Sequence, residues 1–285
     1  MALYIKRDDR YALQPGSPLQ GNKLRKLAPL LRRTKDLPQR RVVTFGGAYS
    51  NHLAALAAAA RQYGFSLHAY VRGEPVTNPT LAYVRSGGAR LTFVSRSDYR
   101  RRHDPEYQRE LGVDATVDLL IPEGGTTPAA LAPVGELVIE LIDQLGYVPE
   151  VLCLSAGTGG TAAGVVRAAR GKPLHVEVFP ALRGDWMTDA IGKLLDPTVH
   201  PGPPPPNCSV ITDYHFGGYA KFPKHWRMYR PQDSIALRVD IGEPDLPPLE
   251  PVYTAKLFTG VLDRIRKGAY ARGTTVVILH TGGIY

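Results

Sequence analysis

The sequence predicts an α/β fold with a parallel sheet and crossover helices. Apolar runs of strand length alternate with helical stretches, and glycine-rich segments join them. The 285 residues are 44% hydrophobic and 21% charged, the composition of an ordinary globular protein. This length allows one large domain or two of medium size, and it buries enough apolar surface to fold without disulfides.

The pattern of strand, glycine loop and helix first occurs in the N-terminal half. Residues 41–45 predict a strand and residues 46–51 a loop. The alanine-rich stretch that follows predicts a helix to Tyr63, which Gly64 ends. Residues 67–71 predict the next strand.

The pattern returns in the C-terminal half. Residues 151–154 predict a strand, residues 155–160 a loop and residues 161–170 a helix, followed by a strand over 175–179. A third copy begins with a strand over residues 275–279 and stops after its loop. Because ligands of parallel α/β proteins gather at the carboxyl ends of strands, these loops are the candidate binding segments.

Charge and composition exclude several classes of function. The net charge of +9 allows nucleic acid, an anionic membrane surface or anionic small ligands as partners. The basic stretches lack the interleaved aromatic residues of a base-stacking surface, so nucleic-acid binding is the weaker hypothesis. Charged residues near the start predict no signal peptide, and the longest aliphatic run, residues 53–60, is far shorter than the ~20 residues of a membrane helix. The two cysteines, Cys153 and Cys208, favour a reducing compartment, the cytoplasm.

The loop over residues 156–161 is the best candidate for an anion site. Its glycines permit close backbone approach, and the next helix directs the positive end of its dipole at the loop. The candidate donors are the amides and hydroxyls of Gly157, Thr158, Gly159, Gly160 and Thr161. A phosphate fits this donor set, and a tight turn with close helix packing is the alternative. The spacing matches neither a P-loop nor the dinucleotide-binding fingerprint.

A second candidate is Lys23, near the start of a predicted helix with Asn22 as its N-cap. A lysine in the first turn lies at the positive end of the helix dipole, which favours the neutral amine that reacts with aldehydes. The alternative is an exposed basic face shared with Arg25 and Lys26, and the residues alone favour that alternative.

Seven motifs, in order along the chain, resemble one enzyme family. They are YIKRDD (4–9), GNKLRKL (21–27), GGAYSNH (46–52), IPEGG (121–125), AGTGGTAAG (156–164), PVYTAK (251–256) and HTGG (280–283). The family is that of 1-aminocyclopropane-1-carboxylate deaminase and D-cysteine desulfhydrase, which depend on pyridoxal phosphate and have the tryptophan synthase β-like fold, fold type II. The resemblance implies two open, twisted, mainly parallel sheets flanked by helices. It also implies a larger cofactor-binding domain from residues 1–40 and 143–285, and a smaller domain from residues 41–142 that closes over the cleft.

The resemblance implies roles for the candidate residues. The catalytic residues would be Lys23, Ser50, Tyr219 and Tyr253. Lys23 would bind the cofactor covalently and, once the substrate displaces it, act as a base. The substrate-binding residues would be Ser50, Asn51 and His52, with Asn51 also contacting the 3′ oxygen of the cofactor. No metal is expected.

Further cofactor contacts follow from the same resemblance. The loop over residues 157–161 would bind the phosphate, which agrees with its interpretation as an anion site. Either Thr254 or Thr281 would contact the pyridine nitrogen and so set the strength of the electron sink. The residue after the tyrosine of PVY is Glu in the ring-opening deaminases and Thr in desulfhydrase-like members. Thr254 therefore favours β-elimination from a small amino acid over ring opening.

The implied function is a lyase, deaminase or hydrolase that releases ammonia and a 2-oxo acid from a small amino acid. One alternative is a β-replacement enzyme of the cysteine synthase type, which the PVYTAK motif disfavours. The other is a non-catalytic, basic nucleic-acid-binding descendant, which the retained Lys23, Asn51 and glycine loop disfavour. By analogy with the family, we expect a cytoplasmic homodimer.

The sequence departs from the family pattern at three places. Family members usually have more chain before the first motif and after the last. Pro29 falls inside the predicted helix, where a proline removes a backbone hydrogen bond and kinks the axis at a cost of ~3 kcal/mol if uncompensated. The sequence between Tyr219 and Tyr253 does not resemble the helix common in relatives, so we expect this wall of the site to be remodelled.

Overall fold

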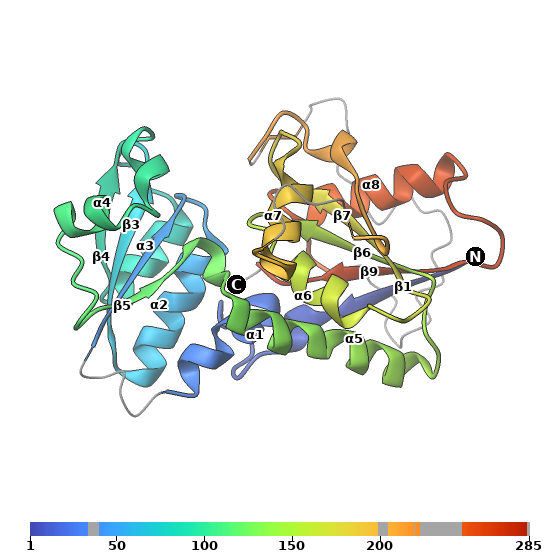
Figure 1. Ribbon diagram of the computed structural model, residues 1–285, viewed down its shortest axis with the longest axis horizontal. Coiled ribbons are helices and arrows are strands. Elements are labelled where there is room, and N and C mark those ends of the chain that lie inside the picture. Colours follow the sequence, from blue (N-terminus) through green and yellow to red (C-terminus); the bar gives the residue numbers. More distant parts are fainter. Residues whose placement is uncertain (34–39, 199–204, 220, 223–246, 284–285) are drawn as a thin grey trace. The chain divides into compact units, whose positions relative to one another are not determined.

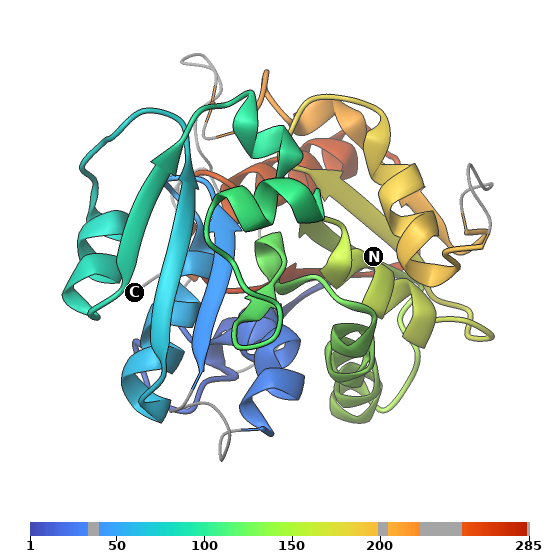
Figure 2. The same ribbon diagram turned by 60° about the vertical axis from the view of Figure 1, so that its left-hand side comes forward.

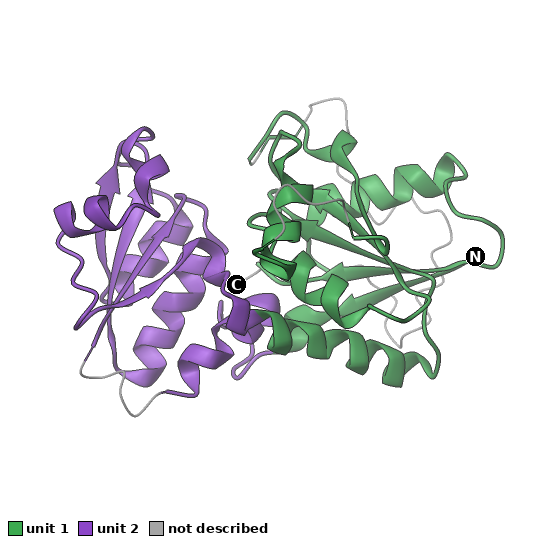
Figure 3. Cartoon of the chain, viewed as in Figure 1, with its two compact units in different colours: residues 1–11, 131–284 green, residues 12–130, 285 purple. Residues whose placement is uncertain are grey.

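The computed structural model describes residues 1–33, 40–198, 205–219, 221–222 and 247–283. The chain divides into two compact units (Figure 3). Unit 1 contains Met1–Tyr11 and Leu131–Ile284, and unit 2 contains Ala12–Ala130. The expected domain boundaries at residues 40 and 142 stay a prediction, because compactness alone does not identify an independently folding domain. Most of the divergent segment between Tyr219 and Tyr253 lies outside the described residues.

Unit 1 contains a sheet of five parallel strands (Figure 1). In order across the sheet they are β1 (Ala2–Arg7), β9 (Thr275–His280), β6 (Val151–Ala156), β7 (His175–Pro180) and β8 (Cys208–Val210). Its helices are α5 (Leu131–Leu145), α6 (Gly160–Ala168), α7 (Trp186–Leu195) and α8 (Thr254–Arg266). Short 3-10 turns lie at Asp8–Arg10 and Thr212–Tyr214.

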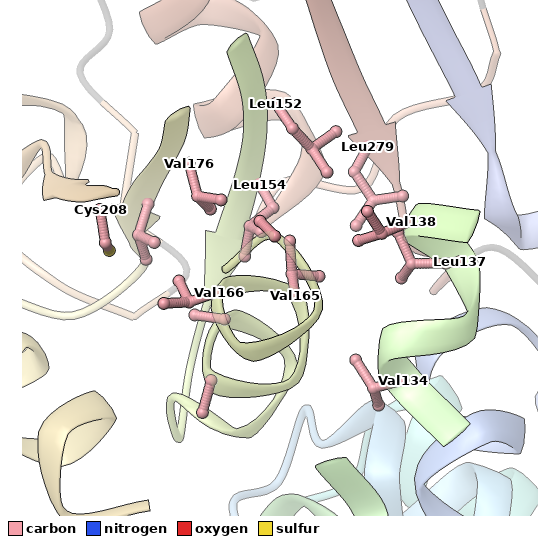
Figure 4. Close-up of a cluster of buried hydrophobic side chains, with 14 of the residues drawn as sticks. Val134, Leu137, Val138, Leu152, Leu154, Val165, Val166, Val176, Cys208 and Leu279 are labelled. Carbon is pink, nitrogen blue, oxygen red and sulfur yellow. The ribbon is translucent and has the colours of Figure 1, made fainter. Parts of the chain in front are cut away.

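Both faces of this sheet are covered, because successive side chains of a strand point to opposite faces. Leu152 and Leu154 of β6 pack in the cluster formed with α5, α6 and α7. Figure 4 shows Leu154 near Val165, and Leu152 near Leu279, among the labelled residues of this cluster. Cys153, between the two leucines, instead lies in the cluster formed with α8. Burial on both faces explains why the strands are continuous apolar runs in the sequence.

Unit 2 contains a sheet of four parallel strands, drawn in blue to green in Figure 2. In order they are β4 (Arg90–Val94), β3 (Ser66–Arg72), β2 (Arg41–Gly46) and β5 (Leu119–Ile121). Its helices are α1 (Gly21–Leu31), α2 (Asn51–Tyr63), α3 (Pro79–Ser86) and α4 (Pro105–Glu110), with 3-10 turns at Asp98–Arg101, Glu123–Gly125 and Pro128–Ala130. Helices α1, α2 and α3 contribute to the cluster on one face, and Tyr99 packs with Phe45 and Tyr70 on the other.

The predicted α/β class, with two parallel sheets flanked by helices, is confirmed. Strands β2, β6 and β9 match the predicted strands within two residues. Helix α2 ends at Tyr63, and the C-cap residue Gly64 has φ +75°. Among the helices of the described residues, none is long and apolar enough to cross a membrane.

The start of α1 differs from the prediction. The helix begins at Gly21, with Gln20 rather than Asn22 in the N-cap position. The reason is that the Gln20 carbonyl accepts hydrogen bonds from the N–H groups of Lys23 (3.1 Å) and Leu24 (3.3 Å). Pro29 lies inside the helix, which continues to Leu31.

Candidate active site residues

The predicted anion loop lies at the carboxyl end of β6, immediately before α6, in unit 1. Gly159 has φ +82°, a conformation that favours glycine, and it precedes the first helical residue, Gly160. Gly160 and Thr161 are buried, whereas Gly157 and Thr158 are half-buried. The first N–H groups of a helix have no intrahelical acceptor and lie at the positive end of its dipole. The loop therefore fits a phosphate group such as that of pyridoxal phosphate.

Of the two predicted tyrosines, Tyr253 lies beside this loop and Tyr219 lies against Tyr253, all in the same unit. A methyl group placed on Gly157 would lie 3.0 Å from the hydroxyl of Tyr253 and 3.1 Å from its Cε1, so the ring packs directly against the loop. The rings of Tyr219 and Tyr253 meet edge to face, with centroids 6.1 Å apart and an interplanar angle of 79°. The structure thus brings the loop and both tyrosines together.

The N-terminus of α8 is organised by Glu250, a residue that sequence reasoning missed. Its Oε1 accepts hydrogen bonds from the N–H groups of Tyr253 and Thr254, both at 2.8 Å, and its Oε2 accepts one from Val252 at 2.7 Å. The Thr254 hydroxyl in turn accepts from the Glu250 N–H at 2.8 Å. Burial raises the pKa of Glu250, and the three N–H groups oppose this by favouring the carboxylate. An acidic residue just before a helix, exchanging bonds with a hydroxyl residue in its first turn, is the signal that could have identified it.

Thr281 follows β9 at the same edge of the sheet as the anion loop. Strands β6 and β9 pair in parallel, with Cys153 opposite Ile278, so their carboxyl ends are neighbours. Thr281 is buried, 8% exposed. Of the two threonines considered for the pyridine nitrogen, Thr254 is fully buried and holds the start of its own helix, whereas Thr281 follows a strand end.

In unit 2, the start of α2 carries Ser50, Asn51 and His52. The Oγ of Ser50 accepts a hydrogen bond from the Leu53 N–H at 3.4 Å, so Ser50 is the N-cap that the sequence predicted. Asn51, half-buried, is the first helical residue, and His52 is buried. The helix thus holds these residues consecutively at the carboxyl end of β2.

The tautomer of His52 follows from its hydrogen bonds. Its Nε2 lies 2.8 Å from the Oγ1 of Thr44, and that hydroxyl donates to the carbonyl of Ile121 at 2.8 Å. Because a hydroxyl has one proton, it must accept from the ring, so Nε2 carries the imidazole proton. The Nδ1 of His52 is buried and has no hydrogen-bond partner among the described residues. Burial, helped by the charges of Lys23 and Lys26, lowers the pKa of His52 well below its usual value.

Lys23 lies in the first turn of α1, as predicted, and is half-buried. Lys26, one turn later, donates from Nζ to the Gly124 carbonyl and to the Thr126 hydroxyl, both at 3.2 Å. A methyl group on Gly125 would lie 3.5 Å from both the Nδ1 of His52 and the Cβ of Lys26. Helices α1 and α2 and the Glu123–Gly125 turn therefore pack together, which brings Lys23 near His52.

The interpretation of this helix as an exposed basic face is wrong. Arg25 is 1% exposed and Lys26 is 5% exposed, and burial together with the charge of Lys23 lowers the pKa of Lys26 well below its usual value. The leucines at positions 24 and 27 could have indicated this, because buried residues on both sides of a helical position leave little exposed surface between them.

The predicted site residues fall into two groups. One group belongs to unit 2 and contains Lys23, Ser50, Asn51 and His52. The other belongs to unit 1 and contains residues 157–161, Tyr219, Tyr253, Thr254 and Thr281. In the described part of the chain, no group of three or more His, Cys, Asp or Glu residues is arranged to hold a metal ion.

Comparison with known proteins points to one family of enzymes. The model of the family described as "Pyridoxal-phosphate dependent enzyme" matches residues 1–198. A protein of Pyrococcus abyssi assigned as a 1-aminocyclopropane-1-carboxylate deaminase is 30% identical, with 99% of this chain and 84% of that protein covered. The bifunctional D-cysteine desulfhydrase/1-aminocyclopropane-1-carboxylate deaminase of Arabidopsis thaliana is 27% identical, covering 99% of this chain and 72% of that protein.

A solved structure shows the same relationship. The crystal structure of an ACC deaminase homologue superimposes with a TM-score of 0.76 at 27% identity, covering 99% of this chain and 84% of that one. The family match, the relatives and the fold agree with the resemblance found in the seven motifs, and they favour neither the β-replacement nor the nucleic-acid-binding alternative. The chain belongs to the family of pyridoxal-phosphate dependent enzymes.

Proposed function

We propose that this pyridoxal-phosphate dependent enzyme is a lyase or deaminase of small amino acids, with D-cysteine or 1-aminocyclopropane-1-carboxylate as its substrate. The products would be ammonia and a 2-oxo acid, with hydrogen sulfide as a third product from D-cysteine. The observation that carries the proposal is Tyr253, whose ring lies against the anion loop and edge to face with Tyr219. The resemblance assigns such a pair of tyrosines to the deaminase and desulfhydrase branch.

Some of the predicted site residues would bind the cofactor and substrate, and others would transfer protons. The bound cofactor would supply an electron sink for the substrate carbon. Lys23 would hold the cofactor and move the proton of the substrate, while the amides and hydroxyls of residues 157–161 would hold its phosphate. Tyr253 would serve as the acid or base beside the loop, and Ser50 would contact the substrate carboxylate.

Two further residues would orient the ligands. Asn51 would hydrogen-bond the 3′ oxygen of the cofactor. His52 presents a buried Nδ1 that acts only as an acceptor, which suits a donor group of a bound substrate. For the pyridine nitrogen we favour Thr281, because the one proton of the Thr254 hydroxyl is already donated to the Glu250 carbonyl at 3.2 Å. A neutral hydroxyl at this nitrogen would make a weaker electron sink than a carboxylate does.

The test is an absorption spectrum of the purified protein and of Lys23→Ala, combined with assays for ammonia and 2-oxo acid. D-cysteine, L-cysteine and 1-aminocyclopropane-1-carboxylate are supplied in turn. We expect a visible band from lysine-bound cofactor that is absent from Lys23→Ala, and product from one of the amino acids. Lys172→Ala, which removes an exposed lysine that lies outside all seven motifs, is the control and should keep both the band and the activity.

The outcomes separate the parts of the proposal. A Lys23→Ala variant that keeps the visible band would overturn the assignment of Lys23. A normal band without product from any of the three amino acids would overturn the substrate class and leave the cofactor assignment intact. Product from D-cysteine alone would agree with Thr254 as a feature of desulfhydrase-like members.

We also propose a homodimer in the cytoplasm. The family resemblance supports the dimer, and the two buried, unbridged cysteines, Cys153 and Cys208, suit a reducing compartment. Sedimentation equilibrium of the holoenzyme would give a mass near twice 31.1 kDa if the dimer forms, and the monomer mass would contradict it.

A further inference from the structure

Lys256 is a buried cation that the proposed reaction does not use. It lies in the first turn of α8 and is 2% exposed. Its Nζ donates to three backbone carbonyls, those of Ala181 (3.0 Å), His215 (2.9 Å) and Gly218 (2.6 Å). An ammonium group has three N–H donors and no acceptor, so this arrangement uses all of them.

The three carbonyls belong to two segments that lie apart from α8 in the sequence. Ala181 directly follows β7, and the residues His215 to Gly218 form the turn that leads into Tyr219. Lys256 therefore ties a strand end and a turn to the start of one helix. Removing the ammonium would leave the buried Ala181 carbonyl and the partly buried carbonyls of His215 and Gly218 without this donor, and buried backbone tolerates such a loss poorly.

The turn before Tyr219 has an unusual backbone. Phe216 has φ +52°, and Gly217 and Gly218 have φ +88° and +133°, so three consecutive residues adopt positive φ. For a bulky residue such as Phe216 this conformation is strained, and it persists only where surrounding contacts hold it. Within the turn, the Gly218 N–H donates to the His215 carbonyl at 3.0 Å. Lys256, which lies outside the turn, adds hydrogen bonds to the carbonyls of His215 and Gly218.

The carboxylate of Glu250 favours the charged form of Lys256. Burial lowers the pKa of Lys256 to about 8, and the negative charge of Glu250 acts in the opposite direction. At neutral pH the side chain is therefore an ammonium, which supplies all three donors. Glu250 itself holds the N–H groups of Tyr253 and Thr254, so the two buried charges together organise the same helix end.

We propose that Lys256 is a positioning residue that holds Tyr219 against Tyr253. Tyr253 is fixed at the start of α8, and Lys256, three residues later on the same helix, fixes the turn that carries Tyr219. The Lys256 ammonium thus links the helix that carries Tyr253 to the turn that carries Tyr219. The catalytic role of the two tyrosines rests on the proposed function. The positioning of Tyr219 by Lys256 rests on the hydrogen bonds alone.

The test replaces the ammonium while keeping the apolar stem, with Lys256→Met. In protein labelled with 3-fluorotyrosine, the ¹⁹F resonance of Tyr219, assigned from Tyr219→Phe, should shift or broaden in Lys256→Met. Lys267→Met is the matched control, because Lys267 lies just after the same helix with its side chain 68% exposed. It should leave the Tyr219 resonance and the activity unchanged.

Kinetics supply the second readout. We expect kcat of Lys256→Met to fall about 10- to 100-fold, because misplacing a catalytic group by an ångström has effects of this size. In a Tyr219→Phe background the same substitution should cost much less, since it acts through a group already removed. If Lys256→Met does not fold, Lys256→Gln, which retains two N–H donors, takes its place.

The outcomes distinguish this inference from the proposed function. An unchanged Tyr219 resonance in a folded variant would overturn the positioning role whatever the activity. A shifted resonance in an enzyme that acts on none of the tested amino acids would support the positioning role and count against the proposed function alone. An equal loss of kcat in the wild-type and Tyr219→Phe backgrounds would show that Lys256 does not act through Tyr219.

Discussion

At the scale of single residues, the missing side chain of Gly157 allows the Tyr253 ring to pack directly against the anion loop. A methyl group there would lie 3.0 Å from the Tyr253 hydroxyl and 3.1 Å from its Cε1, shorter than ordinary van der Waals contact. We expect Gly157→Ala to displace the Tyr253 ring and to lower kcat about 10-fold or more. Steady-state kinetics with whichever amino acid proves to be the substrate would measure this.

The control for this prediction removes the tyrosine hydroxyl. In a Tyr253→Phe background the shortest contact no longer exists, so Gly157→Ala should have a smaller effect than in the wild type. Urea unfolding should show that Gly157→Ala remains folded. Equal effects in both backgrounds would mean that the methyl group acts on the loop and not on Tyr253.

Single residues also show which roles could be predicted from the sequence and which could not. Ser50 as a helix cap and Lys23 in a first turn follow from local patterns, because their partners lie within a few residues. Lys256 and Lys26 were missed as structural donors, because their carbonyl partners lie in segments far away in the chain. A buried lysine whose partners are backbone atoms leaves no matching acidic residue in the sequence to signal it.

At the scale of elements, the crossing of α5 and α6 sets the position of the anion loop. A methyl group on Gly164 of α6 would lie 2.7 Å from the Cγ1 of Val134 and 2.9 Å from the carbonyl of Leu131. A real side chain cannot occupy that space unless the helices separate. We expect Gly164→Ala to lower the free energy of unfolding by about 1–3 kcal/mol, the usual cost of overpacking, as measured by urea denaturation.

The matched control is Gly192→Ala in α7, where a methyl group would meet no atom within 4 Å. Alanine is the better helix former, so this variant should be as stable as the wild type or more so, by about 0.5–1 kcal/mol. Because α6 begins at the anion loop, Gly164→Ala should also bind pyridoxal phosphate more weakly. Normal stability of Gly164→Ala would contradict the close packing of these helices.

Elements were predicted better than their arrangement. The strands β2, β6 and β9 were identified from apolar runs followed by glycine loops, since a doubly covered strand is apolar along its whole length. The order of strands could not be predicted, because it depends on pairings across the chain. Ala2 of β1 pairs with Thr275 of β9, and no local pattern records that contact.

At the scale of the whole molecule, two buried histidines couple the stability of the fold to pH. Burial, together with the charges of Arg90 and Arg41, lowers the pKa of His68 to about 4. The ring of His68 lies with Nε2 2.8 Å from the Oγ1 of Thr92, on the neighbouring strand. The pKa of His52 is lowered in the same direction. Both side chains are therefore neutral in the folded protein at pH values where the unfolded chain protonates them.

The sign of the effect follows from proton binding. The unfolded chain binds a proton at His68 near pH 6.5, whereas the folded protein binds it only near pH 4. Between these values the unfolded state holds more protons, so the free energy of unfolding falls as the pH falls. We expect the urea midpoint, followed by far-ultraviolet circular dichroism, to decrease steadily from pH 7 to pH 5.

Replacing one histidine tests whether these residues cause the decrease. His68→Gln keeps a polar group that can bond Thr92 but cannot be protonated, so the urea midpoint of this variant should vary less with pH than that of the wild type. His175→Gln is the matched control: it also removes a strand histidine that lies 2.8 Å from a hydroxyl, that of Ser209, on the neighbouring strand. If His68→Gln shows the full acid dependence of the wild type, His52 or the carboxylates must account for it, since they are the other groups that gain protons in this range.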